Sequence, residues 1–106
     1  MNYLSAHILG KVLDNVEDID GWNLSFGDAS LVIYNPIEIF TNGTLCEHPN
    51  LTIIKGATVK EILETELEVK LIFNENRCVR VDLRPESYSG PEAMVLHIAN
   101  NGFVVW

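Results

Sequence analysis

The strongest constraint on the fold is an alternation of apolar residues that is interrupted once and then resumes. Residues 67–73 place apolar side chains at every second position, and residues 79–83 do the same after Asn74-Glu75-Asn76. This pattern predicts two strands with one buried face, joined by a tight turn into an antiparallel hairpin. Because a register shift of one residue would bury Arg80 and Asp82, the pairing is well specified.

The first half of the chain has the same design. Residues 22–26 alternate, Gly27-Asp28-Ala29 predicts a turn, and residues 31–33 form the return strand. The two halves align at an offset of roughly 47 residues, which also brings Gly10 onto Gly56. Either a degenerate internal repeat or the convergence of ordinary hairpin patterns accounts for this match. A repeat favours two similar β-meanders packed together, since a solenoid needs about three units.

Further short strands are expected at residues 37–41, 44–46, 51–54, 93–98 and 103–106. Asn42-Gly43 is a strong hairpin signal, and Asn100-Asn101-Gly102 predicts the turn before the last strand. Residues 11–20 and 58–66 fit either a short helix or a strand. Because isolated helices of that length are marginal, we favour strands or a single helical turn there.

These elements predict a mainly β chain, either an antiparallel β-sandwich or an open barrel-like roll, built from two similar meanders with room for one short helix. The 106 residues are enough for one domain and too few for two ordinary ones, so we expect a single domain over 1–106. The first residues show neither a signal peptide nor a membrane span, which favours the cytoplasm.

The net charge of −8 restricts the class of partner. Residues 1–53 hold seven acidic residues and one basic residue, whereas residues 54–106 hold eight and six. Nucleic acids and anionic membranes are disfavoured, since phosphate groups are bound by Lys and Arg. The acidity therefore either keeps the protein in solution or attracts a basic partner protein.

No motif for catalysis, cofactor binding or metal binding is present. The chain lacks a nucleophile elbow and a phosphate-binding glycine loop. Cys46-Glu47-His48 brings a thiol near an imidazole in sequence, but a catalytic Cys–His pair requires a spatial arrangement and a third, orienting group. The cysteines and histidines have no zinc-ligand spacing. We therefore expect a protein that is not an enzyme and has neither catalytic residues, a cofactor nor a metal.

The candidate partner-binding residues come from two acidic clusters and from the tyrosines. A run of charge is most often a solvated face, but carboxylates beside exposed tyrosines also form the kind of surface that binds Lys and Arg of another protein. The candidate residues are Asp14, Glu17, Asp18, Asp20, Tyr34, Glu64, Glu66 and Tyr88.

The order of these motifs carries a family resemblance. Trp22-x-Leu-x-Phe26, Leu71-x-Phe73 and the segment Tyr88-Ser89-Gly90-Pro91-Glu92-Ala93-Met94 occur in this order within about 10–104. The pattern resembles small acidic immunity proteins that accompany toxins in bacterial polymorphic-toxin and contact-dependent growth-inhibition systems. The resemblance implies an inhibitor that covers the active site of a cognate toxin domain, often a basic nuclease. It transfers no residue roles.

Two other functions fit the sequence. A small-ligand-binding β-roll, or an enzyme, would need an apolar pocket with converging polar groups, for which His97 and Glu92 are candidates. An assembly module would use the strand Phe103–Trp106, which could pair across an edge to give a homodimer.

Overall fold

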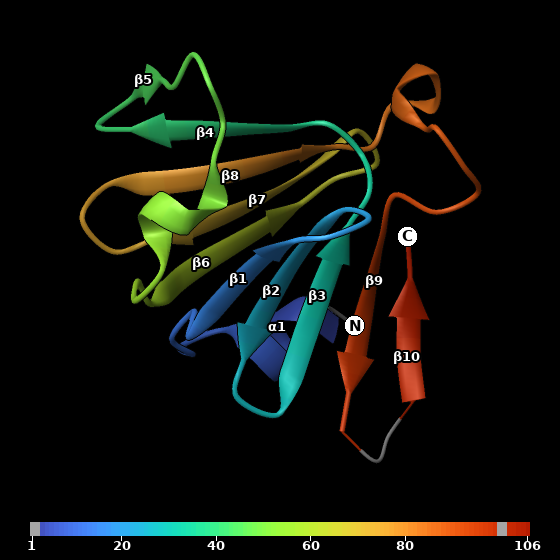
Figure 1. Ribbon diagram of the computed structural model, residues 1–106, viewed down its shortest axis with the longest axis horizontal. Helices are drawn as coiled ribbons and strands as arrows, with labels where there is room; N and C mark the ends of the chain where they lie inside the picture. The colour runs from blue at the N-terminus through green and yellow to red at the C-terminus, as the bar shows by residue number, and fades with distance from the viewer. Residues whose placement is uncertain (1–2, 100–101) are drawn as a thin grey trace.

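The computed structural model describes residues 3–99 and 102–106, and its strands form two antiparallel five-stranded sheets (Figure 1). The first sheet contains, in spatial order, β1 (Asn15–Asp18), β2 (Trp22–Phe26), β3 (Ala29–Ile33), β9 (Met94–Ile98) and β10 (Gly102–Val105). The second contains β5 (Thr44–Leu45), β4 (Ile37–Thr41), β8 (Arg77–Asp82), β7 (Glu68–Phe73) and β6 (Val59–Glu64). The helical elements are α1 (Tyr3–Ile8) and the 3₁₀ turns η1 (Leu51–Ile54) and η2 (Pro85–Ser87).

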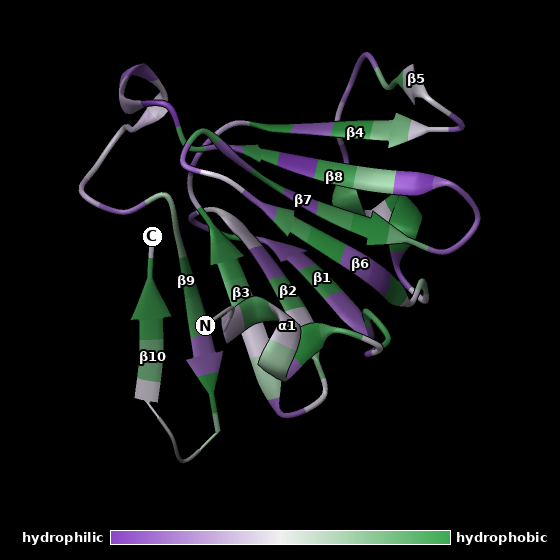
Figure 2. Ribbon diagram, turned by 180° about the vertical axis from the view of Figure 1, so that it is seen from behind, coloured by the Kyte–Doolittle hydropathy of each residue, from purple (hydrophilic) through white to green (hydrophobic). Residues whose placement is uncertain are grey.

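The prediction of a mainly β chain that forms an antiparallel β-sandwich with one short helix is confirmed. Alternate residues of β2, β3, β7 and β8 face a single shared hydrophobic core, with Phe26 and Phe73 among its largest fully buried side chains. In Figure 1, α1 lies behind the first sheet and η1 lies in front of the second, an arrangement that Figure 2 shows from the other side. Leu4 and Ile8 of α1 are fully buried in the same core.

The two sheets are built from two meanders that exchange their final hairpins. The strands β1–β2–β3 form one meander and β6–β7–β8 the other, but β4 pairs with β8 and β9 pairs with β3. The registers agree between the halves: Leu31 pairs with Leu96 as the equivalent Val79 pairs with Ile39. This agreement is what the internal-repeat interpretation predicts, and the exchange ties each half to the other.

The two halves of the chain also meet at an isolated antiparallel bridge between Val12 and Thr58, which precede β1 and β6. The Gly10 amide donates a hydrogen bond to the Val59 carbonyl at 2.8 Å, and the Gly56 amide donates to the Leu13 carbonyl at 2.7 Å. Because Gly10 matches Gly56 in the sequence alignment, the two bonds occupy equivalent positions in the two halves. The two halves are therefore related at this bridge by an approximate two-fold axis.

The structure corrects several local expectations. Residues 51–54 form the turn η1 rather than a strand, because the Asn50 side chain accepts a hydrogen bond from the Thr52 amide at 3.0 Å and caps the turn. The helix lies at α1, in a segment for which the sequence predicts no element. Strands β1 and β6 occupy the two ambiguous segments. Two residues of the expected turn, 100–101, lie outside the described residues.

Candidate protein-binding site at the acidic end

The two chain segments that cross between the sheets meet at one end of the molecule, on the right of Figure 1. The Asn35 side-chain amide donates a hydrogen bond to the Asp82 carbonyl at 2.7 Å, and the Tyr34 amide donates to the Ala93 carbonyl at 2.8 Å. The turns β1–β2 and β6–β7 reach the same end. We define the acidic end as residues 18–21, 34–36, 64–67 and 83–93.

The β1–β2 turn packs closely against the ring of Tyr34. Gly21 has a φ of +112°, and a Cβ atom there would lie 2.8 Å from the Ile33 carbonyl oxygen and 3.1 Å from Cδ1 of Tyr34. Only glycine combines this backbone conformation with such a close approach. The packing leaves the Tyr34 side chain 44% exposed.

Tyr34 separates two shallow grooves. The larger, of about 380 Å³, is lined by residues that include Asp18, Trp22, Tyr34, Pro36, Ser87 and Ser89. The smaller, of about 280 Å³, is lined by Tyr34 and residues 89–92. The exposed Tyr34 ring therefore has Asp18, Ser87 and Ser89 in the groove on one side. It has Ser89 and Glu92 in the groove on the other.

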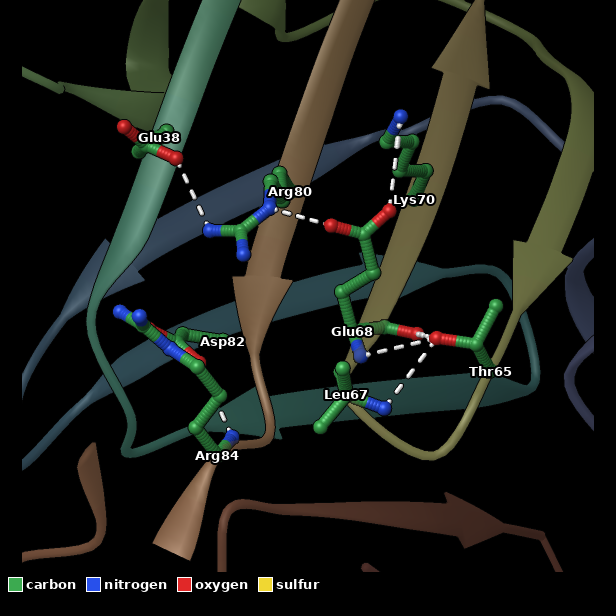
Figure 3. A network of polar contacts seen from close by, with 8 residues as sticks. All are labelled: Glu38, Thr65, Leu67, Glu68, Lys70, Arg80, Asp82 and Arg84. Atoms are coloured by element: carbon green, nitrogen blue, oxygen red, sulfur yellow. Dashed lines mark hydrogen bonds and ion pairs between the residues drawn. The ribbon is translucent and has the colours of Figure 1, made fainter. Parts of the chain in front are cut away.

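The β6–β7 turn is fixed by the hydroxyl of Thr65, which accepts hydrogen bonds at 3.2 Å from both the Leu67 and the Glu68 amides (Figure 3). The Leu67 carbonyl accepts a bond from the Leu83 amide at 2.9 Å, which attaches the turn to the crossing segment. Leu67 is 58% exposed, and Ile19, in the turn of the other meander, is 62% exposed. Both turns therefore present an apolar side chain among carboxylates.

The basic residues leave the acidic end with an uncompensated negative charge. All three arginines and two of the four lysines form ion pairs, mostly with carboxylates of the second sheet. Figure 3 shows Arg80 between Glu38 and Glu68 on that sheet. In the described part of the chain, by contrast, Asp18, Asp20 and Glu66 have neither an ion pair nor a side-chain hydrogen bond.

One ion pair anchors the crossing segment itself. Arg84 donates hydrogen bonds to both carboxylate oxygens of Asp82, the shortest at 2.6 Å, and its backbone amide donates another at 2.9 Å. These bonds hold the pKa of the Asp82 carboxyl far below its ordinary value. The charge of Arg84 is therefore used locally and does not neutralise the exposed carboxylates nearby.

The structure brings most of the candidate residues together. Those at the acidic end are Asp18, Asp20, Tyr34, Glu64, Glu66 and Tyr88. Glu64 accepts a hydrogen bond from the Trp106 indole at 2.9 Å, so it also serves a structural role. Asp14 lies away from this end and accepts a hydrogen bond from the Gly27 amide at 2.9 Å. Glu17 lies at the border of the end, in a groove that it lines with Ile19 and Asn23 but not with Tyr34.

Sequence reasoning missed two exposed apolar residues in the turns that reach this end. Ile19 and Leu67 lie in turns, where the alternation of the strands ends and no longer indicates which face a side chain takes. Ser87 and Ser89, from the crossing segment after β8, line the same groove as Asp18 and Tyr34. The available signal was an isolated apolar residue inside an otherwise polar, acidic turn.

His97 and Glu92, the two candidates for a small-ligand pocket, do not line a common pocket. The His97 ring contacts that of Phe103 in a tilted arrangement, with centroids 6.0 Å apart and planes at 44°, whereas Glu92 lines the small groove beside Tyr34. Within residues 3–99 and 102–106, no cluster of three or more His, Cys, Asp or Glu side chains has the arrangement of a metal site. Cys78 is half-buried on β8, and this burial raises the pKa of its thiol.

The fold thus defines the class as a two-sheet β-sandwich with one short helix. Comparison of the chain with family models, with curated proteins and with solved structures finds no match in any of the three. No helix among the described residues has the length and apolar character needed to cross a membrane.

Proposed function

We propose that this protein is an immunity protein that binds a cognate, basic toxin domain and neutralises it by covering its active site. The observation that carries the proposal is the acidic end, where the exposed Tyr34 lines a groove with the unpaired carboxylate of Asp18. The exposed Ile19 and Leu67 lie in the two turns that reach the same end. Exposed apolar and aromatic side chains ringed by charge are the usual composition of a protein-binding surface.

The charge of this end favours a partner rich in Lys and Arg. A nuclease must hold phosphate groups, so its active site is basic and attracts a negative surface. Complementary charge increases the rate of encounter, and the increase weakens as salt screens the field. The buried contacts of Tyr34 and the two apolar residues would then slow dissociation.

Inhibition by this surface requires no chemical step. A rigid end that fills the entrance of a basic cleft excludes the nucleic acid by steric overlap and by repulsion of its phosphates. The packing of Gly21 against Tyr34 and the Asp82–Arg84 pair hold that end in place before binding. The proposal places this binding in the cytoplasm, where a nuclease delivered from a neighbouring cell meets its substrate.

A growth assay tests this function. The C-terminal domain of the protein encoded immediately upstream is expressed in bacteria with and without this chain. We expect that domain alone to stop growth and its co-expression with this chain to restore growth. Growth arrest that persists despite a well-folded, abundant product of this chain would contradict the proposal.

A matched pair of variants locates the surface. Asp18→Asn with Asp20→Asn removes two negative charges at the acidic end, and asparagine tolerates the positive φ of 51° at position 20. Asp28→Asn with Glu47→Gln removes two charges elsewhere, in the β2–β3 turn and after β5. We expect the first pair to reduce protection and the second to preserve it. Equal protection by both would remove Asp18 and Asp20 from the binding surface.

A further inference from the structure

The strand β10 is an edge of the first sheet and differs from the other edge strands. Edge β1 carries two carboxylates, edge β6 carries three charged residues, and edge β5 has only two residues. Strand β10, with the sequence Gly-Phe-Val-Val, has no charged residue, and Figure 2 shows the contrast with β1 and β6. Natural proteins normally protect such edges with charge, because an open edge pairs with another strand.

The hydrogen-bond pattern identifies which backbone groups of β10 are open. Trp106, just beyond the strand, donates its amide to the Met94 carbonyl at 3.0 Å, and Val104 pairs with Leu96. Because antiparallel residues alternate in the side toward which they bond, Phe103 and Val105 direct their N–H and C=O groups away from β9. These groups face the free edge of the sheet.

The side chains around this edge are apolar and exposed. Phe103 is 65% exposed and Val105 is 44% exposed. They border a hollow of about 580 Å³ whose other lining residues are Tyr3, His7, Ile98 and Val104. Among the described residues, no Asp, Glu, Lys or Arg lines this hollow, so no charged side chain there opposes the contact of a second copy.

We infer that two copies of this chain pair antiparallel through β10, which joins their first sheets into one continuous sheet. An isologous arrangement places Phe103 of one copy opposite Val105 of the other, so that each such pair exchanges two backbone hydrogen bonds. The two Val104 residues then face each other across the axis. The C-terminal end of this interface adjoins the acidic end, because Trp106 directly follows β10 and donates its indole N–H to Glu64.

This contact is short, and its stability depends on the apolar residues beside it. Four strand residues together with Tyr3 bury less surface than a permanent dimer requires. We therefore expect a dimer that dissociates on dilution. Sedimentation velocity of the purified protein over a wide concentration range measures this directly, and a monomer at every concentration would overturn the inference.

Variants at Val105 test the edge. Val105→Lys places a charge on the strand, and Val105→Pro removes an outward N–H that β9 does not use. Both are expected to abolish the dimer and to retain the far-ultraviolet circular dichroism of the folded chain. The matched control is Leu45→Lys, at an equally exposed position on edge β5, which should leave the dimer intact. A dimer lost in Leu45→Lys and retained at Val105 would place the contact on β5 instead.

A cysteine at position 104 tests the register. In the proposed pairing the two Val104 residues form a non-hydrogen-bonded pair, whose Cα separation of about 4.5 Å permits a disulfide. Val104→Cys should therefore give a covalent dimer under mild oxidation, whereas Phe103→Cys, which faces residue 105 of the other copy, should not. Cross-linking of Phe103→Cys alone would contradict the register. Because these experiments use the protein without a partner, their failure is separate from failure of the proposed function.

Discussion

At the scale of single residues, the acidic end depends on groups that the charge pattern does not reveal. The candidate carboxylates could be chosen from the sequence because clusters of Asp and Glu are visible in it. The contact of Gly21 with Tyr34 is not visible in the charge pattern, since it depends on the register of the β2–β3 hairpin, one position beyond the pair Trp22 and Ile33. The pairing of Asp82 with Arg84 was also hidden, because the alternation in 79–83 indicates only that Asp82 faces away from the core.

Asp82→Asn should destabilise the protein in a pH-dependent way. The Asp82 side chain is 7% exposed, and its folded-state pKa lies below its unfolded value, so its charge stabilises the fold above about pH 4. We expect the variant to lose about 2 kcal/mol of unfolding free energy at neutral pH. The gap should narrow as the pH falls below 4, because Asp82 then protonates in the unfolded chain while it stays charged in the folded one. Urea unfolding at several pH values measures the gap, and a gap independent of pH would contradict this assignment.

Gly21→Ala should lower the free energy of unfolding more than Gly27→Ala, the same change in the β2–β3 turn. Its Cβ would clash with the Ile33 carbonyl and the Tyr34 ring, so we expect a loss of about 2 kcal/mol. Gly27→Ala serves as the control, since φ there is +72° but no atom of the described residues lies within 4 Å of the added Cβ; a loss of about 1 kcal/mol is expected. Equal losses in urea unfolding would mean that the packing on Tyr34 has no energetic weight.

At the scale of elements, the alternation of apolar residues predicted the strands whose one face packs on the core. Strands such as β7 and β8 are flanked by turns and have one buried face, so their period is visible in the sequence. The helix α1 has only six residues, and its buried pair Leu4 and Ile8 is too short a pattern to distinguish from a loop. The turn η1 has β-branched residues but is held by its cap at Asn50.

The outer face of the second sheet is held by a charge ladder that crosses three strands. Arg80 on β8 contacts Glu68 on β7 at 2.6 Å and Glu38 on β4 at 2.9 Å. The Arg80 guanidinium lowers the pKa of Glu68, whose side chain is the less exposed of the two partners.

A double-mutant cycle with Arg80→Gln, Glu68→Gln and Glu38→Gln should therefore give unequal coupling. We expect about 1 kcal/mol for Arg80 with Glu68 and about half of that with the more exposed Glu38. Both coupling energies should decrease in high salt. A larger coupling to Glu38 would contradict the geometry.

At the scale of the whole molecule, the exchange of hairpins makes each sheet depend on both halves of the chain. Pairs β4–β8 and β3–β9 join residues that are far apart in sequence, and one hydrophobic core serves both sheets. The offset of the two meanders could be read from the sequence. The exchange could not, because alternation indicates the buried face of a strand and does not identify its neighbour.

This arrangement predicts one cooperative unfolding transition. Trp22 lies on β2, and Trp106 follows β10 and donates its indole N–H to Glu64 of β6. Their fluorescence therefore reports on the first sheet and on its contact with the second, whereas far-ultraviolet circular dichroism reports on all strands. The two signals should give the same midpoint in urea. Separate midpoints would show that the sheets unfold independently despite the exchanged hairpins.

The unpaired carboxylates at the acidic end determine the long-range electrostatic attraction between the molecule and a basic partner. Turns from both meanders bring Asp18, Asp20 and Glu66 to the crossing segments, while the cations are mostly paired elsewhere. Long-range attraction to a basic surface should therefore be lost when these charges are removed and should weaken with salt.

The most direct measurement is capture of the upstream-encoded domain by the immobilised protein, with association rates recorded at low and high salt. We predict rapid capture at low salt, a slower rate at high salt, and a reduced low-salt rate for Asp18→Asn with Asp20→Asn but not for Asp28→Asn with Glu47→Gln. If the domain is not captured, or if both pairs of variants associate as fast as the wild type at low salt, the acidic end is not the binding surface.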